Sequence, residues 1–347
     1  MRRINIGVIG CGYIAQTAHL SNLLKIPEAR LIAVADISEE KLAQVKRRFA
    51  IKEFYKDYNR ILKNPNIDAV LICTPTHLHA KIAIEAAEAK KHVFCEKPMA
   101  RTSKEAQEMI KAARENDVKL MIGHFLRFLP NHELAKRYIR DGRIGKPTYV
   151  EAHSEVPGPY SLPRTHFFFK KELGGGIILD YGVHLVDLVY WLMDSRILSV
   201  GAFIHTFMNL EVENEASLII RLENNLIGSI KMFWVTWKSW EPIERYIKVL
   251  GTEGKIISEL TGPSLMIYRE GTLLSRILGI QRIIPKELHP KLPGSQYAYK
   301  KELEEFINAI IRDKDPPVTG EDGLIAIKVI EAAKESVEKK AIIQINY

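Results

Sequence analysis

The sequence has few cysteines and no long run of apolar residues. It holds three cysteines in 347 residues, Cys11, Cys73 and Cys95, an odd number placed within expected strands or directly after them. A disulfide framework is therefore not expected, and a reducing compartment is favoured. No stretch reaches the about 18 uninterrupted apolar residues of a membrane span, and the amino terminus lacks the apolar segment of a signal peptide. We expect a cytoplasmic protein with no membrane partner.

The sequence also lacks a continuous cluster of basic residues. The net charge is +8, from 50 basic and 42 acidic residues, but the basic residues are scattered in short clusters such as Lys46 to Arg48. There is no basic stripe with interleaved aromatic residues, and no zinc-knuckle or helix-turn-helix spacing. We therefore expect no nucleic-acid partner. A mildly basic chain suits a protein that handles an anionic dinucleotide.

A glycine fingerprint follows the first expected strand. The apolar run Ile4 to Ile9 is typical of a parallel strand covered on both faces, and G-C-G-Y-I-A follows at positions 10–15. Glycines in such a turn permit a tight bend and let the backbone approach a pyrophosphate, although a purely structural turn looks similar. The candidate cofactor contacts in this turn are Gly10, Gly12, Tyr13 and Ile14.

An acidic residue ends the second expected strand. Leu31 to Ala35 is apolar and leads into Asp36, which lies 24 positions after Gly12. A carboxylate there can accept hydrogen bonds from ribose hydroxyls and repels a 2′-phosphate, and no arginine occupies positions 37 or 38. Asp36 therefore favours NAD over NADP, the alternative being that it only starts a turn or caps the helix near Glu39.

Two further strand ends carry polar residues. Thr74 and Pro75 break the strand that ends at Cys73, and Lys97 stands at the end of a later strand, where ligands bind in open parallel sheets. His77 is interpreted as solvent-facing. His77 and His79 have no acidic or cysteine neighbour that completes a ligand set, so no metal site is expected. The candidate cofactor contacts here are Thr74, Pro75, Glu96, Lys97 and His79, the last as a packing and hydrogen-bonding residue.

An apolar helix after a glycine triplet carries four polar or aromatic residues on one stripe. Asp180, His184, Asp187 and Trp191 follow spacings of four, three and four. Burying two carboxylates and a histidine is costly unless they have partners. Either this stripe is a site, or His184 is a satisfied core histidine and Asp187 pairs with a surface arginine.

Together these motifs resemble the Gfo/Idh/MocA oxidoreductase family. The matching patterns are G-x-G-x-x-A, the strand-end Asp36, T-P-x-x-x-H, H-V-x-x-E-K-P and G-G-x-x-x-D-x-G-x-H-x-x-D-x-x-x-W-L, with similar turns at 251–254 and 316–323. The resemblance implies an α/β Rossmann domain, here 1–123, followed by an α+β domain, here 124–347, with a large, mostly antiparallel open sheet. It also implies that the last helix, about 322–338, packs back toward the first domain.

The same resemblance implies an NAD-dependent oxidoreductase that acts on a secondary alcohol or ketone of a sugar, cyclitol or related polyhydroxy compound. It places Lys97, Asp180 and His184 around the reacting carbon. Histidine suits the role of general acid and base, and lysine that of a cation beside the alkoxide. The alternatives are a redox-neutral, NAD-dependent glycoside hydrolase and a non-catalytic ligand-sensing regulator.

Departures from the family pattern affect the predicted substrate contacts. Where members often read G-F-x-R-R-F-x-P, this chain reads G-H-F-L-R-F-L-P at 123–130, which leaves Arg127 as a candidate. Lys90 replaces the usual glycine at a left-handed helix cap. The open sheet of the family commonly pairs with a second subunit, so we expect a homodimer or homotetramer. Further candidate substrate contacts lie on the loop 157–171, namely Tyr160, Arg164 and His166.

Overall fold

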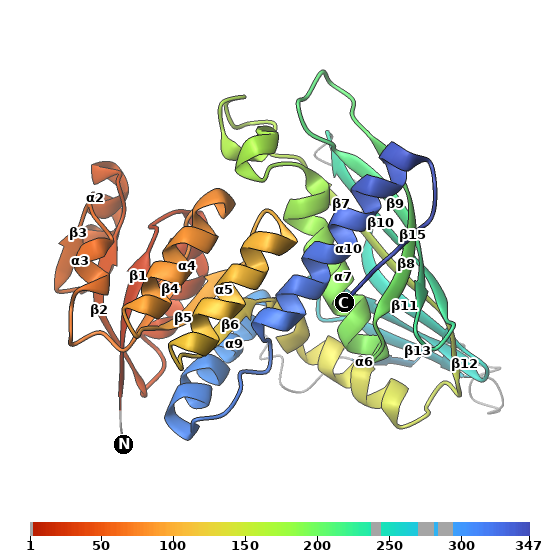
Figure 1. Ribbon diagram of the computed structural model, residues 1–347. Helices are drawn as coiled ribbons and strands as arrows, with labels where there is room; N and C mark the ends of the chain where they lie inside the picture. The colour runs from red at the N-terminus through yellow and green to blue at the C-terminus, as the bar shows by residue number, and fades with distance from the viewer. Residues whose placement is uncertain (1–2, 237–243, 270–280, 284–293) are drawn as a thin grey trace. The chain divides into compact units, whose positions relative to one another are not determined.

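The computed structural model of this chain describes residues 3–236, 244–269, 281–283 and 294–347 (Figure 1). The chain divides into two compact units, one of Met1–Phe125 with Tyr299–Leu324 and one of Leu126–Ala298 with Ile325–Tyr347. The segment Tyr299–Leu324 therefore packs with the first unit, whereas the sequence placed it in a second domain that begins at residue 124. Sequence patterns do not reveal such a return of the chain, because the contacts that define it are not local.

The first unit is built on a six-stranded parallel sheet with the order β3-β2-β1-β4-β5-β6. This is the Rossmann order, with its switch point between β1 and β4, and it confirms the predicted fold of this part. The strands are β1 (Ile4–Ile9), β2 (Ala29–Ala35), β3 (Glu53–Tyr55), β4 (Ala69–Ile72), β5 (His92–Glu96) and β6 (Leu120–Gly123).

Helices connect these strands and bury their apolar faces. Ser38 caps α2 and Thr102 caps α5, each through a side-chain oxygen that accepts a backbone N–H. Phe306 packs edge-on against Phe94 at a centroid distance of 5.7 Å, which attaches α9 (Gly294–Arg312) to the sheet. The other helices are η1 (Ala15–His19), α1 (Leu20–Leu23), α2 (Glu39–Arg48), α3 (Asn59–Leu62), η2 (Thr76–Leu78), α4 (His79–Glu88), α5 (Ser103–Glu115) and η3 (Phe125–Phe128).

The second unit contains a mixed sheet of nine strands within the described residues, in the order β14-β13-β12-β11-β7-β10-β9-β8-β15. Only the β7 and β10 pair is parallel among the described pairs, so the mostly antiparallel sheet is confirmed. The strands are β7 (Pro147–Pro157), β8 (Ile197–His205), β9 (Glu215–Leu222), β10 (Ile227–Val235), β11 (Arg245–Gly251), β12 (Gly254–Glu259), β13 (Leu265–Arg269), β14 (Gln281–Ile283) and β15 (Ile343–Gln344).

The sequence predicts five strands of this sheet, and each overlaps an observed strand: 146–155, 197–208, 216–222, 226–235 and 243–250. The turn at 251–254 joins β11 to β12. The predicted start of the β11 strand at Ile243 lies outside the described residues. The sequence does not predict β12 to β15. Those strands are short and alternate weakly, so their pairing depends on the neighbouring strands.

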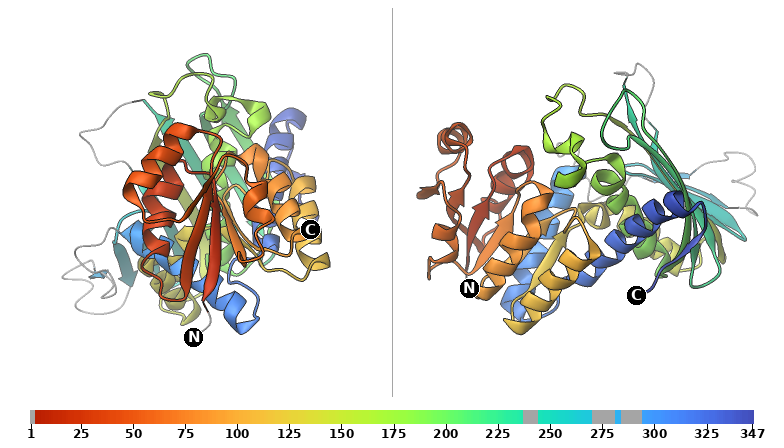
Figure 2. Two further views of the ribbon diagram at one scale, coloured as in Figure 1. Left: turned by 90° about the vertical axis from the view of Figure 1, so that its left-hand side faces the viewer. Right: turned by 45° about the horizontal axis from the view of Figure 1, so that its top comes forward.

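Helices cover one face of this second sheet. Gly182 lies against Met232 of β10 and Ile330 of α10 (Gly320–Lys339), so close that a Cβ there would come within 3.0 Å of Ile330. Figure 2 shows α7 (Val183–Met193) and α10 along this face, and no helix on the opposite face among the described residues, which we call the helix-free face. The remaining helices of the unit are α6 (Pro130–Arg140), η4 (Phe167–Phe169), η5 (Lys171–Leu173) and η6 (Ile178–Gly182).

The segment Lys171–Met193 is long and apolar enough to cross a membrane by length and composition alone. However, 78% of its most apolar window is buried inside the protein. The helices η6 and α7 supply most of this segment, which therefore has the burial expected of a core helix.

Candidate active site

The ends of β1 and β4 meet at the glycine turn. Gly10 has φ +96°, and a Cβ there would lie 2.6 Å from the carbonyl carbon and oxygen of Cys73. Only glycine fits such a close approach with that backbone conformation. At Gly12 a Cβ would meet nothing within 4 Å, and Tyr13 beside it is 83% exposed. The turn therefore presents open backbone next to Thr74, where a pyrophosphate can approach.

Asp36 is hydrogen-bonded to the backbone of this turn. Its Oδ2 accepts the backbone N–H of Cys11 at 2.7 Å, and its Oδ1 accepts that of Ser38 at 2.8 Å. Both hydrogen bonds fix the carboxylate at the carboxyl end of β2, next to the glycine turn. A half-buried carboxylate held in this way can also accept ribose hydroxyls, so the donor and acceptor set here fits NAD.

His79 joins the two loops that follow β4 and β5. It is 1% exposed, with Nδ1 2.8 Å from the Pro98 carbonyl oxygen and Nε2 2.7 Å from that of Thr74. Burial lowers the pKa of His79, and a neutral imidazole donates to one of these oxygens at a time. Its position agrees with a packing and hydrogen-bonding role. His77 is half-buried rather than solvent-facing, because Nδ1 is enclosed.

Lys97 directly follows β5, and its half-buried side chain starts the loop that Pro98 continues. Glu96 is 6% exposed; its Oε2 accepts the Lys97 backbone N–H at 3.1 Å, and its Oε1 lies 2.6 Å from His19 Nε2. Burial alone would raise the pKa of Glu96, but the hydrogen bond and charge of His19, together with the charges of Lys97 and His79, outweigh burial and lower the pKa. Glu96 therefore holds the lysine loop from inside, where the sequence predicts a cofactor contact.

Asp180 and His184 lie at the junction of η6 and α7 in the second unit. Gly176, with φ +97°, starts this segment, and a Cβ there would come within 2.5 Å of the Glu213 carboxylate. The Asp180 backbone N–H then donates to the Gly176 carbonyl at 3.0 Å. His184 is 5% exposed and meets the Tyr181 ring edge-on at 5.6 Å. On the polar stripe of this helix, His184 and Asp187 are therefore buried and Asp180 is half-buried.

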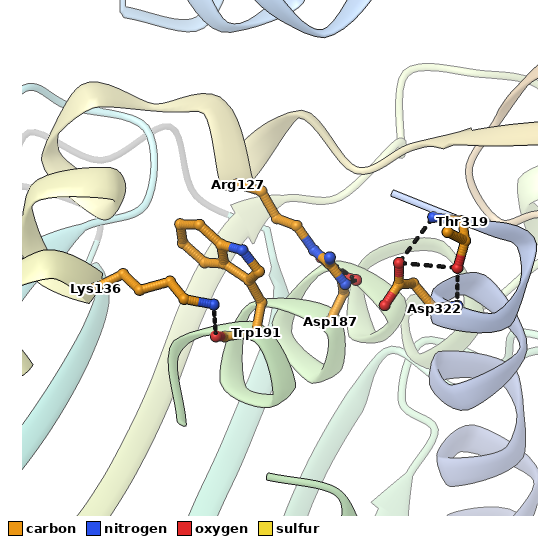
Figure 3. Close-up of polar contacts among 6 residues, drawn as sticks. All are labelled: Arg127, Lys136, Asp187, Trp191, Thr319 and Asp322. Atoms are coloured by element: carbon orange, nitrogen blue, oxygen red, sulfur yellow. Dashed lines mark hydrogen bonds and ion pairs between the residues drawn. The ribbon is translucent and has the colours of Figure 1, made fainter. Parts of the chain in front are cut away.

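Arg127 is held in a buried ion pair. Its guanidinium makes a bidentate ion pair with Asp187 at 2.5–3.1 Å, and the two side chains are 5% and 1% exposed (Figure 3). The ion pair gives the guanidinium a structural role, and the predicted substrate contact of Arg127 stays a prediction. The ion pair also shows that Asp187 pairs with an arginine, although a buried one. Nearby, Lys136 Nζ donates to the Trp191 carbonyl at 2.7 Å.

The predicted loop residues all have local contacts. Tyr160 donates to the Trp234 carbonyl at 2.9 Å, Arg164 lies over the Phe169 ring, and His166 Nδ1 accepts the Phe168 N–H. These contacts order the loop and leave the substrate roles of the three residues as predictions.

The predicted catalytic residues thus come from both units: Lys97 from the first, and Asp180 and His184 from the second. Sequence reasoning missed His19, Glu213 and Glu302, three buried or half-buried residues next to predicted positions. His19 follows the fingerprint by four residues, which is the only local signal that any of them offers.

Comparison with known proteins identifies the family. A model described as an oxidoreductase family with an NAD-binding Rossmann fold matches residues 4–124, and a model of the Gfo/Idh/MocA C-terminal domain matches residues 132–257. The chain belongs to the Gfo/Idh/MocA family. The earlier resemblance is thereby confirmed.

Relatives of this Gfo/Idh/MocA chain include several dehydrogenases. It is 30% identical over 350 residues to the myo-inositol 2-dehydrogenase of Thermotoga maritima, covering 99% of each chain. It is 29% identical over 352 residues to the scyllo-inositol 2-dehydrogenase (NAD(+)) of Bacillus subtilis, covering 99% of this chain and 97% of that one. The solved structure of a levoglucosan dehydrogenase in complex with NADH matches with a TM-score of 0.89 at 25% identity, covering 99% and 100%. The chain is an NAD-dependent oxidoreductase that acts on CH–OH groups.

Proposed function

We propose that this enzyme moves a hydride between NAD and a secondary alcohol or ketone of a sugar, cyclitol or related polyhydroxy compound in the cytoplasm. The observation that carries the proposal is that Lys97 directly follows β5 and begins the loop that His79 joins to the loop after β4. The names of the relatives, which include two inositol dehydrogenases, support the substrate class.

The residues of the first unit would bind and orient the cofactor. Gly10 and Gly12 would admit the pyrophosphate, Asp36 would accept the ribose hydroxyls, and the Thr74 and Pro98 loops would border the nicotinamide end. Bound NAD supplies the hydride acceptor of the reaction.

The remaining chemistry is a proton transfer at the substrate hydroxyl. We assign His184 as the group that takes the hydroxyl proton and returns it in the reverse direction. The Lys97 ammonium stabilises the oxygen as it gains negative charge, and Asp180 orients the imidazole or holds a neighbouring hydroxyl. A base and a cation at one oxygen are what the oxidation of an alcohol requires.

The test of this function is NADH formation with a panel of inositols, aldoses, anhydrosugars and uronic acids. The proposal expects NADH fluorescence to rise with at least one secondary alcohol in the panel and the reverse reaction to proceed with the matching ketone. Cleavage of a glycoside without accumulation of NADH would instead identify a redox-neutral hydrolase, and no turnover together with ligand-induced stabilisation would identify a sensor.

We also propose that two copies pair through the helix-free face. Phe203, Ile219 and Ile227 are 87%, 62% and 50% exposed on adjacent strands. The strand register places all three on one face, because Ile219 pairs with Gly201 and Ile227 pairs with Arg221. Exposed apolar side chains gathered on one sheet face are typical of an interface between subunits.

A further inference from the structure

Three buried ionisable side chains meet inside the first unit. His19 comes from η1, Glu96 from β5 and Glu302 from α9, with exposed fractions of 0%, 6% and 0%. One nitrogen or oxygen atom of each lies within 4.8 Å of those of the other two. We call these residues the His–Glu–Glu cluster.

Two of the three side chains are paired and one is not. Glu96 is bound on both oxygens, by His19 Nε2 and by the Lys97 backbone N–H. Neither carboxyl oxygen of Glu302 has a hydrogen-bond partner among the described residues. A fully buried ionised carboxylate without a partner is among the most costly groups in a protein interior.

The ionised groups near Glu302 do not offset the free-energy cost of burying its carboxylate. Burial raises the pKa of Glu302 well above its usual value, and the negative charge of Glu96 raises it further. Aromatic rings border the cluster: His19 meets Phe94 and Tyr299 edge-on, and Phe94 meets Phe306. The other ionisable groups that face the cluster are Lys97 and His79, which act on Glu96, and the buried thiols of Cys73 and Cys95.

We propose that Glu302 is a positioning residue that stays protonated and shares its proton with Glu96, so that Glu96 holds the Lys97 backbone in place. The proposal rests on the role proposed above for Lys97. A separation of up to 4.8 Å is closed by a rotation of the Glu302 side chain or by one bridging water. The proton removes one of the two negative charges. It also lets Glu302 donate a hydrogen bond to the Glu96 carboxylate, which holds the lysine loop.

The same three side chains are the ligand types of a divalent cation, and geometry favours the proton. Two ligand atoms on one tetrahedral zinc ion, each about 2.0–2.1 Å from the metal, lie about 3.3 Å apart. His19 Nε2 and Glu96 Oε1 are only 2.6 Å apart, which is a hydrogen-bond distance. Binding of a metal would require this pair to open.

Infrared spectroscopy of the purified enzyme tests the protonation directly. A protonated carboxyl in a dry site gives a C=O stretching band that shifts on transfer to heavy water. We expect this band near neutral pH in the wild type and in Glu305→Gln, a matched change on the same helix, and its loss in Glu302→Gln. Absence of the band from the wild type, or its survival in Glu302→Gln, overturns the proposal. One equivalent of bound metal that disappears in Glu302→Gln overturns it as well.

Kinetics test the positioning role. Because glutamine donates the hydrogen bond of a protonated glutamate, Glu302→Gln should recover most of the turnover that Glu302→Ala loses, about tenfold in kcat, with the affinity for NAD unchanged in both. Equal kcat values for the alanine variant and the wild type would overturn the positioning role. If Lys97→Ala itself keeps full turnover, the proposed role of the lysine fails, while the infrared band still reports on Glu302 independently.

Discussion

At the scale of single residues, the parts of the site that local geometry determines could be predicted from the sequence. Gly10 needs a positive φ and space that no side chain allows, and Asp36 ends a strand at a fixed offset from the turn. The surroundings of Arg127 and Glu302 could not be predicted, because the residues that they meet lie 60 or more positions away in the chain. The sequence offers no pattern for a buried pair across such a separation.

The cofactor preference is a property of Asp36 alone. We expect Asp36→Ser to weaken NAD binding about tenfold through the loss of charge-assisted hydrogen bonds to the ribose, and to narrow the preference over NADP. Isothermal titration with both cofactors measures this. Asp57→Ser, a change at an exposed aspartate, should leave both affinities unchanged. Equal weakening of NAD and NADP binding in Asp36→Ser would show that the carboxylate only supports the turn.

At the scale of elements, the Rossmann strands and the apolar helix α7 were predicted because their patterns are local and strong. The return of α9 to the first unit was not predicted. Phe306 explains it physically, since it packs α9 against Phe94 of β5. Likewise, α6 is fixed by His132, which is 0% exposed and lies between the carbonyls of Leu126 and Glu259 at 2.8 and 3.0 Å.

His132 should make the second unit sensitive to acid. Burial lowers the pKa of His132 to about 4, against about 6.5 in the unfolded chain. The unfolded chain then takes up a proton first as the pH falls, so the stabilising effect of the neutral imidazole is complete above about pH 6.5 and is lost toward about pH 4.

Urea denaturation measures this contribution. We expect the loss of unfolding free energy between about pH 7.5 and pH 5 to be smaller by about 2 kcal/mol in His132→Gln than in the wild type. His205→Gln, at an exposed site on β8, should retain the wild-type dependence. A parallel pH dependence of His132→Gln and the wild type would show that His132 titrates normally.

The ion pair between Arg127 and Asp187 joins η3 to α7, so we expect its loss to lower the free energy of unfolding. Removing one partner leaves an unpaired buried charge, so Arg127→Met should cost about 3–5 kcal/mol of unfolding free energy. The double variant Arg127→Met with Asp187→Leu should recover much of that loss. Additive losses in the double variant, measured by denaturation, would contradict a direct pair.

At the scale of the whole molecule, the sequence predicted a parallel sheet followed by a mostly antiparallel sheet. It did not predict which unit each of the last segments of the chain belongs to. The division falls within α10, whose start is fixed by a reciprocal pair of hydrogen bonds between Thr319 and Asp322 (Figure 3). The helix-free face of the second sheet carries the exposed Phe203.

We expect the oligomeric state to depend on contacts made by the helix-free face. We expect sedimentation velocity at micromolar concentration to show a dimer or tetramer, and Phe203→Glu to shift it toward the monomer, because a charge would be buried at the interface. Leu24→Glu, a similar change at an exposed site of the first unit, should not. A monomeric wild type would contradict the proposed pairing.

The most direct test of the central claim compares turnover and cofactor binding in Lys97→Ala and His184→Ala. Once a substrate is known, both variants should lose NADH formation almost completely while their affinity for NAD stays close to that of the wild type. The exposed controls Lys81→Ala and His205→Ala should keep wild-type turnover. Weakened NAD binding with normal turnover per bound cofactor would contradict the assignment of these residues to the reacting hydroxyl.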